Sequence, residues 1–301
     1  DADRALVDPS LAAGQVVLVG NTTGWTCGVA PVAIANGVQG VLYAGGGVYI
    51  TDGSNVTITD STISGNSASG PNKYLAGGIY AWNSQLTVIN STITGNRAYG
   101  IDYLAGGASV SYGTAGIYNS TISGNTTSTS SNVTAGGLLI GAENTTSLAV
   151  SNTILSGNTG SQADMGVFNG SNVISEFNLM GTALSGSFTG NGNVFSDAPG
   201  LGALANNGGP TLTMKPNTGS LALGAGSIAL IPAGVTTDQR GTGFARVVNG
   251  SLDVGAVEAA AGAGVVAATS VPTPTLSTWA LGLLGGLLAL FGLRKRKRAD
   301  G

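Results

Sequence analysis

Few residues of this chain could catalyse a reaction. The 301 residues include no histidine and one cysteine, Cys27. A Ser-His-Asp triad, a Cys-His pair and a histidine-ligated metal are therefore excluded. Two carboxylates could still act as general acid and base, and Asp238 and Asp253 form the best candidate pair. In the alternative, structural interpretation, Arg240 bridges carboxylates in a closing loop through its planar guanidinium.

A polysaccharide-active enzyme would need carboxylates gathered on one face, with Ca²⁺ and a basic residue or with a second carboxylate. The repeats described below supply only Asp52, Asp60, Asp102, Glu143, Lys73 and Arg97. The carboxylates stand at unequal repeat positions. We therefore expect no catalytic residue, no metal site and no cofactor, and keep a lyase or glycoside hydrolase on a β-helix as the alternative function.

The charge distribution argues against nucleic-acid binding. Only 8% of the residues are charged, and five of the eleven basic residues lie together at residues 294–298. The remainder of the chain is mildly acidic. Such a surface repels phosphate backbones.

Aromatic residues form the second group that could bind a ligand. Every tyrosine falls between residues 43 and 118. Tyr49, Tyr80, Trp82 and Tyr103 could form an outward strip that contacts a glycan or a protein partner. The alternative is that these rings pack against each other between neighbouring strands.

The elements that position these residues come from a repeated heptapeptide. It reads DSTISGN at residues 60–66, NSTITGN at 90–96, NSTISGN at 119–125 and NTILSGN at 152–158. A repeat of about 30 residues is typical of a solenoid, in which each unit buries its apolar side chains only against its neighbours.

Within each repeat, a glycine pair precedes a short alternating strand, and a second strand leads into the heptapeptide. Alternation places the first and third residues of the first strand on one face, as in Val48 and Ile50. One further aliphatic residue, such as Ile63, follows the turn. Because the strands are short and show no helical period between them, we predict an all-β fold, a parallel β-helix with regular coils over about residues 44–160.

Polar positions of the heptapeptide should form ladders at the corners of the solenoid. Asparagine tolerates left-handed backbone angles, and stacked amides can bond to one another at the spacing of neighbouring strands. The predicted structural ladder residues are Asn66, Asn90, Asn96, Asn119, Asn125, Asn152 and Asn158. Several also stand in Asn-x-Ser/Thr sequons, so glycosylation is the functional alternative.

Residues 190–260 contain a series of motifs with a known counterpart. They include ANNGGPTLT at 205–213, GSLALGAG at 219–226, DQRG at 238–241 and DVGAVE at 253–258. The series resembles the choice-of-anchor Q domain, which follows β-helical repeats in bacterial surface proteins. Gly224 stands where that family has an aspartate. The resemblance implies a right-handed, pectin-lyase-like β-helix over residues 1–180, with residues 181–260 continuing or capping it.

The end of the chain has the layout of a membrane-sorting signal. Residues 261–275 have the composition of a linker, and residues 276–293 carry no charge and are long enough for a transmembrane helix. Residues 274–279 (PTLSTW) with the basic run after residue 293 resemble the IPTL-type signal that exosortase-like transpeptidases process. The residues that carry the resemblance are Pro274, Thr275, Leu276, Ser277, Trp279, Arg294, Lys295 and Arg296.

These observations together predict a bacterial cell-surface or secreted protein with a structural or adhesive role. Its transmembrane helix and basic tail, residues 276–298, would hold it in the membrane with the tail in the cytoplasm. Its expected partners are the membrane, an exosortase-like enzyme, and extracellular glycans or other surface proteins.

Overall fold

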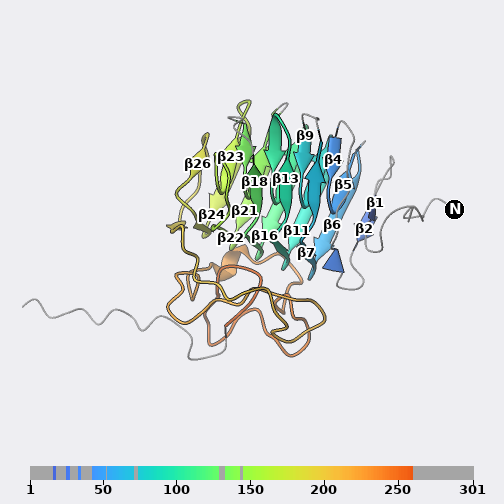
Figure 1. Cartoon of the computed structure of the whole chain (residues 1–301). Helices are drawn as coiled ribbons and strands as arrows, with labels where there is room; N and C mark the ends of the chain where they lie inside the picture. The colour runs from blue at the N-terminus through green and yellow to red at the C-terminus, as the bar shows by residue number, and fades with distance from the viewer. Residues whose placement is uncertain are drawn as a thin grey trace, which may run out of the picture. The chain divides into compact units, whose positions relative to one another are not determined.

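A computed structural model shows that the chain folds as an all-β parallel solenoid, as the repeats predict (Figure 1). It describes residues 43–51, 53–70, 74–128, 133–142 and 145–259, and the backbone of three short strands before residue 43. Asp52, Lys73, Glu143 and the predicted linker, transmembrane helix and sorting signal lie outside the described residues. Within the described ranges, no helix is long and apolar enough to cross a bilayer.

Five parallel sheets run along the solenoid, and each is built from strands of successive coils. Sheet A comprises β1 (Val16–Val17), β5 (Val48–Ile50), β10 (Ile79–Trp82), β15 (Ala108–Ser111), β20 (Leu138–Ile140), β23 (Met165–Val167) and β26 (Leu184–Ser185). Sheet B comprises β2 (Trp25–Cys27), β6 (Asn55–Thr59), β11 (Gln85–Ile89), β16 (Thr114–Tyr118), β21 (Ser147–Ser151) and β24 (Asn172–Glu176). Sheet C comprises β3 (Ala33–Ile34), β7 (Thr62–Ser64), β12 (Thr92–Thr94), β17 (Thr121–Ser123), β22 (Ile154–Leu155), β25 (Leu179–Met180) and β27 (Val194–Phe195).

Two further sheets occupy the stretches between the heptapeptide and the next glycine pair. Sheet D comprises β8 (Ser67–Ser69), β13 (Arg97–Tyr99) and β18 (Thr126–Ser128), and sheet E comprises β4 (Tyr43–Gly45), β9 (Tyr74–Ala76), β14 (Tyr103–Ala105) and β19 (Thr134–Ala135). Their inward residues Ala68, Leu75, Ala98 and Leu104 form a small core of their own. The sequence pattern predicted no strand in these stretches. A strand with one inward residue shows no alternation to detect.

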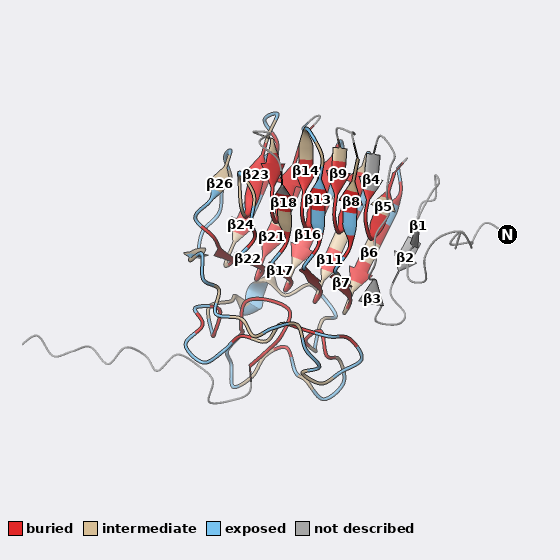
Figure 2. Ribbon diagram, viewed as in Figure 1, coloured by how far each residue is buried: buried red, intermediate tan, exposed pale blue. Residues whose placement is uncertain are grey.

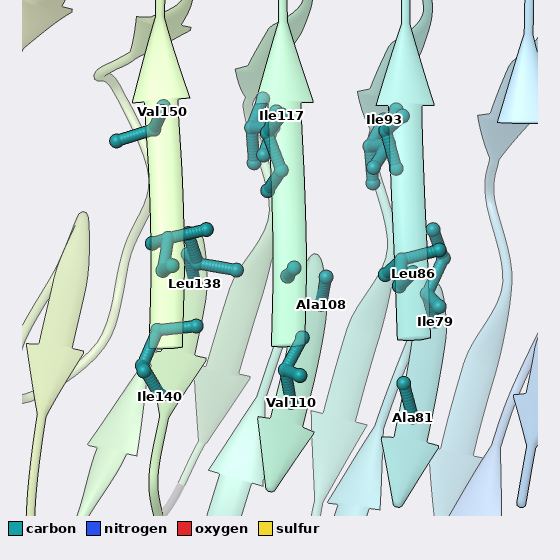
Figure 3. Close-up of a cluster of buried hydrophobic side chains, with 14 of the residues drawn as sticks. Ile79, Ala81, Leu86, Ile93, Ala108, Val110, Ile117, Leu138, Ile140 and Val150 are labelled. Atoms are coloured by element: carbon teal, nitrogen blue, oxygen red, sulfur yellow. The ribbon is translucent and has the colours of Figure 1, made fainter. Parts of the chain in front are cut away.

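Equivalent side chains of successive coils stack inside the solenoid. Ile79 on β10 pairs with Val48 on β5 and with Ala108 on β15, so one aliphatic residue follows another along the axis. Figure 3 shows Ile140, Val110 and Ala81 aligned in this way. All the aliphatic residues predicted to point inward from sheets A, B and C belong to one buried core, and buried residues dominate most strands of these sheets (Figure 2). Each fully buried aliphatic side chain contributes about 1.5–3 kcal/mol.

The turn between sheets B and C explains why the heptapeptide recurs. Its first residue adopts a left-handed conformation in each of the four coils, with φ of 49° at Asp60, 46° at Asn90, 47° at Asn119 and 50° at Asn152. Aspartate and asparagine tolerate this conformation better than other residues with a side chain. The polar first position of the heptapeptide is thus a requirement of the turn.

After β27 the chain leaves the solenoid and folds back along sheet C. This part, residues 199–259, is called the C-terminal segment below. It contains turns, isolated antiparallel bridges and one 3-10 helix, η1 (Ile228–Leu230). Its Ala222 and Val254 pack on Ile154 and Leu179 of the solenoid, so the two parts share an apolar contact.

Candidate functional site

A continuous ladder of buried amides runs through the corner that follows sheet C. The Nδ2 atoms of Asn66, Asn96 and Asn125 each donate to the Oδ1 atom of the asparagine in the next coil at 2.9 Å, ending at Asn158. The same Oδ1 atoms also accept a backbone N–H from the preceding coil, at 3.0–3.1 Å. The ladder therefore holds both side chain and backbone of each corner.

The ladder ends on a residue that the sequence did not reveal. Asn158 donates its Nδ2 and its backbone N–H to Oδ1 of Asp164, at 2.9 and 3.0 Å. Burial raises the pKa of Asp164, against the hydrogen bonds from Asn158, which lower it. Only six residues separate the two, so the 30-residue period gave no signal for Asp164.

The other predicted asparagines lie at the first position of the heptapeptide, and two of them bond to the C-terminal segment. Asn90 donates to Oδ1 of Asp60 at 3.2 Å and to the carbonyl of Thr237 at 2.8 Å. Asn152 donates to the carbonyl of Ser227 at 3.0 Å and accepts its N–H at 2.8 Å. Asn119 is buried, and its side-chain amide has no hydrogen-bond partner among the described residues.

Burial favours the structural interpretation over glycosylation at three of the sequons. Asn119 and Asn125 have no exposed surface and Asn90 is 4% exposed. A glycan cannot be accommodated at these three amides in the folded protein.

Two pairs of tyrosines stack face to face. Tyr49 and Tyr80, on adjacent strands of sheet A, stack with centroids 5.7 Å apart and 8° between the planes. Tyr74 and Tyr103, on adjacent strands of sheet E, stack at 4.8 Å and 11°. Tyr80 is only 1% exposed. Stacked rings present edges rather than faces to solvent, which favours packing as the role of these pairs.

A third aromatic pair is more accessible. Trp82 is half-buried at the end of β10, and its ring lies 5.6 Å from that of Tyr112 at a tilt of 57°. Tyr112 is 41% exposed and adopts a left-handed conformation at the turn after β15. Four aromatic residues were predicted to contact a partner. Of these, Trp82 is the one whose aromatic neighbour, Tyr112, is most exposed to solvent.

One glutamine of the C-terminal segment forms hydrogen bonds with hydroxyl groups of sheet C. Gln239 is fully buried, and its Oε1 accepts from Oγ1 of Thr92 at 2.6 Å. Its Nε2 donates to Oγ1 of Thr62 at 2.9 Å and to the carbonyl of Ser61 at 3.0 Å. Gln239 thereby connects two neighbouring coils, in a role that its place in DQRG did not predict.

The two carboxylates that could have formed an acid-base pair are engaged in the structure. Asp238 is fully buried and receives a bidentate ion pair from Arg240, with the shortest N–O distance 2.6 Å. Asp253 accepts the N–H of Gly224 and of Ala259, both at 2.7 Å. Among the described residues no group of three or more Asp, Glu or Cys is placed to hold a metal ion. This arrangement supports the structural interpretation of the pair.

Arg240 was expected to bridge two carboxylates, but among the described residues it binds only one. Its second contact is the carbonyl of Glu258, at 2.7 Å, and not a second carboxylate. Its guanidinium also lies 3.9 Å above the ring of Phe244, a cation–π contact.

The carboxylate of Glu258 is bound by a second arginine that the sequence did not single out. Arg246 is 1% exposed and pairs with Oε1 of Glu258, while its other N–H groups donate to the carbonyls of Gly255 and Asp253. Burial raises the pKa of Glu258 to about 7, and the charge of Asp253 adds to the shift, whereas Arg246 lowers it. Two buried carboxylates, those of Asp238 and Glu258, are thus each paired with one guanidinium group.

Comparison with known proteins identifies one motif. The IPTL-CTERM motif matches residues 269–298, which confirms the prediction of an IPTL-type signal. No curated protein and no solved structure matches the chain.

The motif indicates a cell-surface or extracellular protein. It is also consistent with processing by an exosortase-like system. The motif begins ten residues after Ala259, the last residue that the structure describes.

Proposed function

We propose that this chain is a structural or adhesive protein of the bacterial cell surface. Residues 276–293 would span the membrane as a helix, with the basic tail in the cytoplasm, until an exosortase-like enzyme sorts the protein. The single observation that carries the proposal is the sorting motif at residues 269–298 following a solenoid body.

The proposal includes a finer assignment of the parts. Residues 1–180 would be a right-handed, pectin-lyase-like β-helix, and residues 181–260 a choice-of-anchor Q domain. The docking of the C-terminal segment on sheet C supports a capping role for that domain.

Fractionation of cells that make the tagged full chain tests the surface assignment. We expect the unaltered protein in the envelope or medium. Trp279→Ala or deletion of residues 294–298 should impair sorting and change this distribution, whereas Trp82→Ala, a matched change in the body, should not. Recovery of the unaltered protein in the cytosol would disprove the assignment.

The adhesive part of the proposal is that Trp82 and the neighbouring Tyr112 contact the partner. Tyr49 and Tyr103, each a member of a stacked pair, would contribute the edges of their rings. Aromatic rings bind sugar rings and protein surfaces through apolar contact with a polar rim. Glycan-array binding of the wild type should be lost in a Trp82→Ala, Tyr112→Ala double variant and retained in Tyr118→Ala. Unchanged binding in the double variant would assign these rings to packing alone.

A further inference from the structure

The C-terminal segment joins the solenoid to the part of the chain that carries the sorting motif. We infer that it is a force-bearing connection, which passes tension from the sorted end of the chain into several coils at once. The inference rests on the proposed function, because only a protein held at that end is pulled there.

Tension applied beyond Ala259 would first reach a fully buried stretch. Every residue from 252 to 259 is buried. Glu258 is held on three sides, because its N–H donates to Oδ2 of Asp238 at 2.8 Å, its carbonyl accepts from Arg240 at 2.7 Å, and its carboxylate pairs with Arg246. Charge-assisted bonds of this kind are about twice as strong as neutral ones.

The same stretch is bonded directly to the solenoid. The N–H of Gly255 donates to the carbonyl of Asn152 at 2.8 Å, and the N–H of Ala256 donates to Oγ1 of Thr121 at 3.0 Å. A Cβ atom at Gly255 would lie 2.7 Å from Cδ1 of Ile154, so the backbone is seated closely on β22. Tension therefore enters two coils before it reaches the rest of the C-terminal segment.

Two more coils share the tension through Gln239. Its N–H donates to the carbonyl of Ala256 at 3.0 Å, and its side chain contacts Thr92 and Thr62. The C-terminal segment is thus bonded to four successive coils, those of β7, β12, β17 and β22.

Without these bonds, the same tension would act on one coil at a time. The chain enters the C-terminal segment from β27, and β25 and β27 are two residues long and lie at the edge of sheet C. A pull at residue 198 would separate such strands pair by pair. Loading several hydrogen bonds together requires more force than breaking them in sequence, so the segment protects the end of the solenoid from unravelling.

Single-molecule force spectroscopy on the full chain, with handles at both ends, tests the inference. The key variant is Thr92→Val with Thr121→Val, which removes two contacts of the C-terminal segment while keeping β-branched residues in sheet C. Thr87→Val, on the outer face of sheet B, is the matched control. Arg246→Met tests the buried stretch itself, with Arg97→Met as its control.

We expect the first event of the wild type to need the highest force and to release residues 199–259 together, about 20 nm of chain. In the double valine variant and in Arg246→Met, this event should fall to the force of the later, coil-by-coil events, and both controls should keep it. Moving one handle to residue 198, by Ala198→Cys in a Cys27→Ser background, should also abolish the high-force event.

A first event no stronger than the later ones, or a double variant with the force of the wild type, would overturn the inference. Because these forces are measured on purified protein, they do not depend on where the protein resides. Cytosolic recovery would thus disprove the surface proposal and leave the mechanical result standing, and the converse also holds.

Discussion

At the scale of single residues, the amides of the Asn ladder act through hydrogen bonds rather than through volume. Oδ1 of Asn125 accepts the Nδ2 and the N–H of Asn96, and its Nδ2 donates to Asn158 and to the carbonyl of Ile93. In a fully buried corner no water can replace these partners.

Replacing Asn125 by alanine should therefore lower the free energy of unfolding by about 2–6 kcal/mol, because two buried donors of Asn96 lose their acceptor at about 1–3 kcal/mol each. Urea titration followed by circular dichroism measures the change. Asn172→Ala, at an exposed position of β24, is the control and should lie near the wild type. Equal midpoints for the two variants would contradict a stabilising role of the ladder.

Glu258 should make the stability of the protein depend on pH. Its pKa of about 7 exceeds the usual value of 4.5, so between these pH values the folded state holds a proton that the unfolded state has lost. Stability should fall as pH rises from about 4.5 to 7, by about 3 kcal/mol in total. Glu258→Gln, which resembles the protonated form, should lose most of this dependence.

Thermal melts of both proteins at pH 5 and pH 8 check this expectation. Burial also raises the pKa values of Asp60 and Asp164, so the variant should keep a residual dependence of the same sign at low pH. A wild type that melts higher at pH 8 than at pH 5 would contradict the argument.

A single residue could be predicted from the sequence only where it recurs with the repeat of about 30 residues. The asparagines of the ladder stand at fixed positions of a repeat, and repetition alone pointed to them. Asp164, Gln239 and Arg246 occur once and bind partners in other coils or loops. Their residue types allow many roles, so only the folded geometry assigns one.

At the scale of elements, the glycine pair before each strand of sheet A is required by close backbone contact between coils. A Cβ atom on Gly107 would lie 2.5 Å from the carbonyl oxygen of Gly137 in the next coil and 3.1 Å from Ile122. The first distance is to backbone, which cannot rotate away.

Gly107→Ala should therefore destabilise the solenoid by about 1–3 kcal/mol or more through overpacking. Gly202→Ala is the control, because its new Cβ would meet atoms only at 3.4 Å and beyond. Differential scanning calorimetry of both variants measures the effect. A Gly107→Ala melting temperature equal to that of the control would show that the coils can move apart at low cost.

Longer strands were easier to predict from the sequence than shorter ones. The five-residue strands of sheet B alternate clearly, and those of sheet A add a glycine pair. In sheet D, β8 and β13 bury only their central residue, and in sheet E, β9 and β14 bury their last two residues. Neither pattern is long enough to show an alternation. The parallel pairing of these strands becomes evident only when Tyr74 and Tyr103 are seen in register.

At the scale of the whole molecule, the contacts of the C-terminal segment depend on the order in which the coils stack. Gln239 contacts Thr62 and Thr92, and Ala256 contacts Thr121, in the order in which these coils stack. These partners lie far apart in sequence, and no local pattern predicts them. The resemblance to the choice-of-anchor Q domain suggested a continuation or cap without its register.

Deleting one coil, residues 91–119, tests this fit. Asn90 would then precede Ser120, and Thr121 would replace Thr92 beside Gln239. Ile154, which has no hydroxyl, would replace Thr121 beside Ala256. We expect the solenoid to fold and melt cooperatively, with residues 199–259 cut by protease at least tenfold faster than in the wild type.

Limited proteolysis with mass spectrometry measures this rate. A further variant with Ile154→Thr in the shortened chain should partly restore protection, because it returns a hydroxyl to Ala256. Wild-type protection in the shortened chain would show that the C-terminal segment does not depend on register.

The direction of the Asn ladder gives the solenoid a beginning and an end. Each asparagine donates toward the following coil, so a newly formed coil keeps two unmet donors until the next one arrives. The carboxylate of Asp164 accepts both donors of Asn158 and has none of its own to pass on. It completes the series, and the repeat can stop without leaving an unpaired amide.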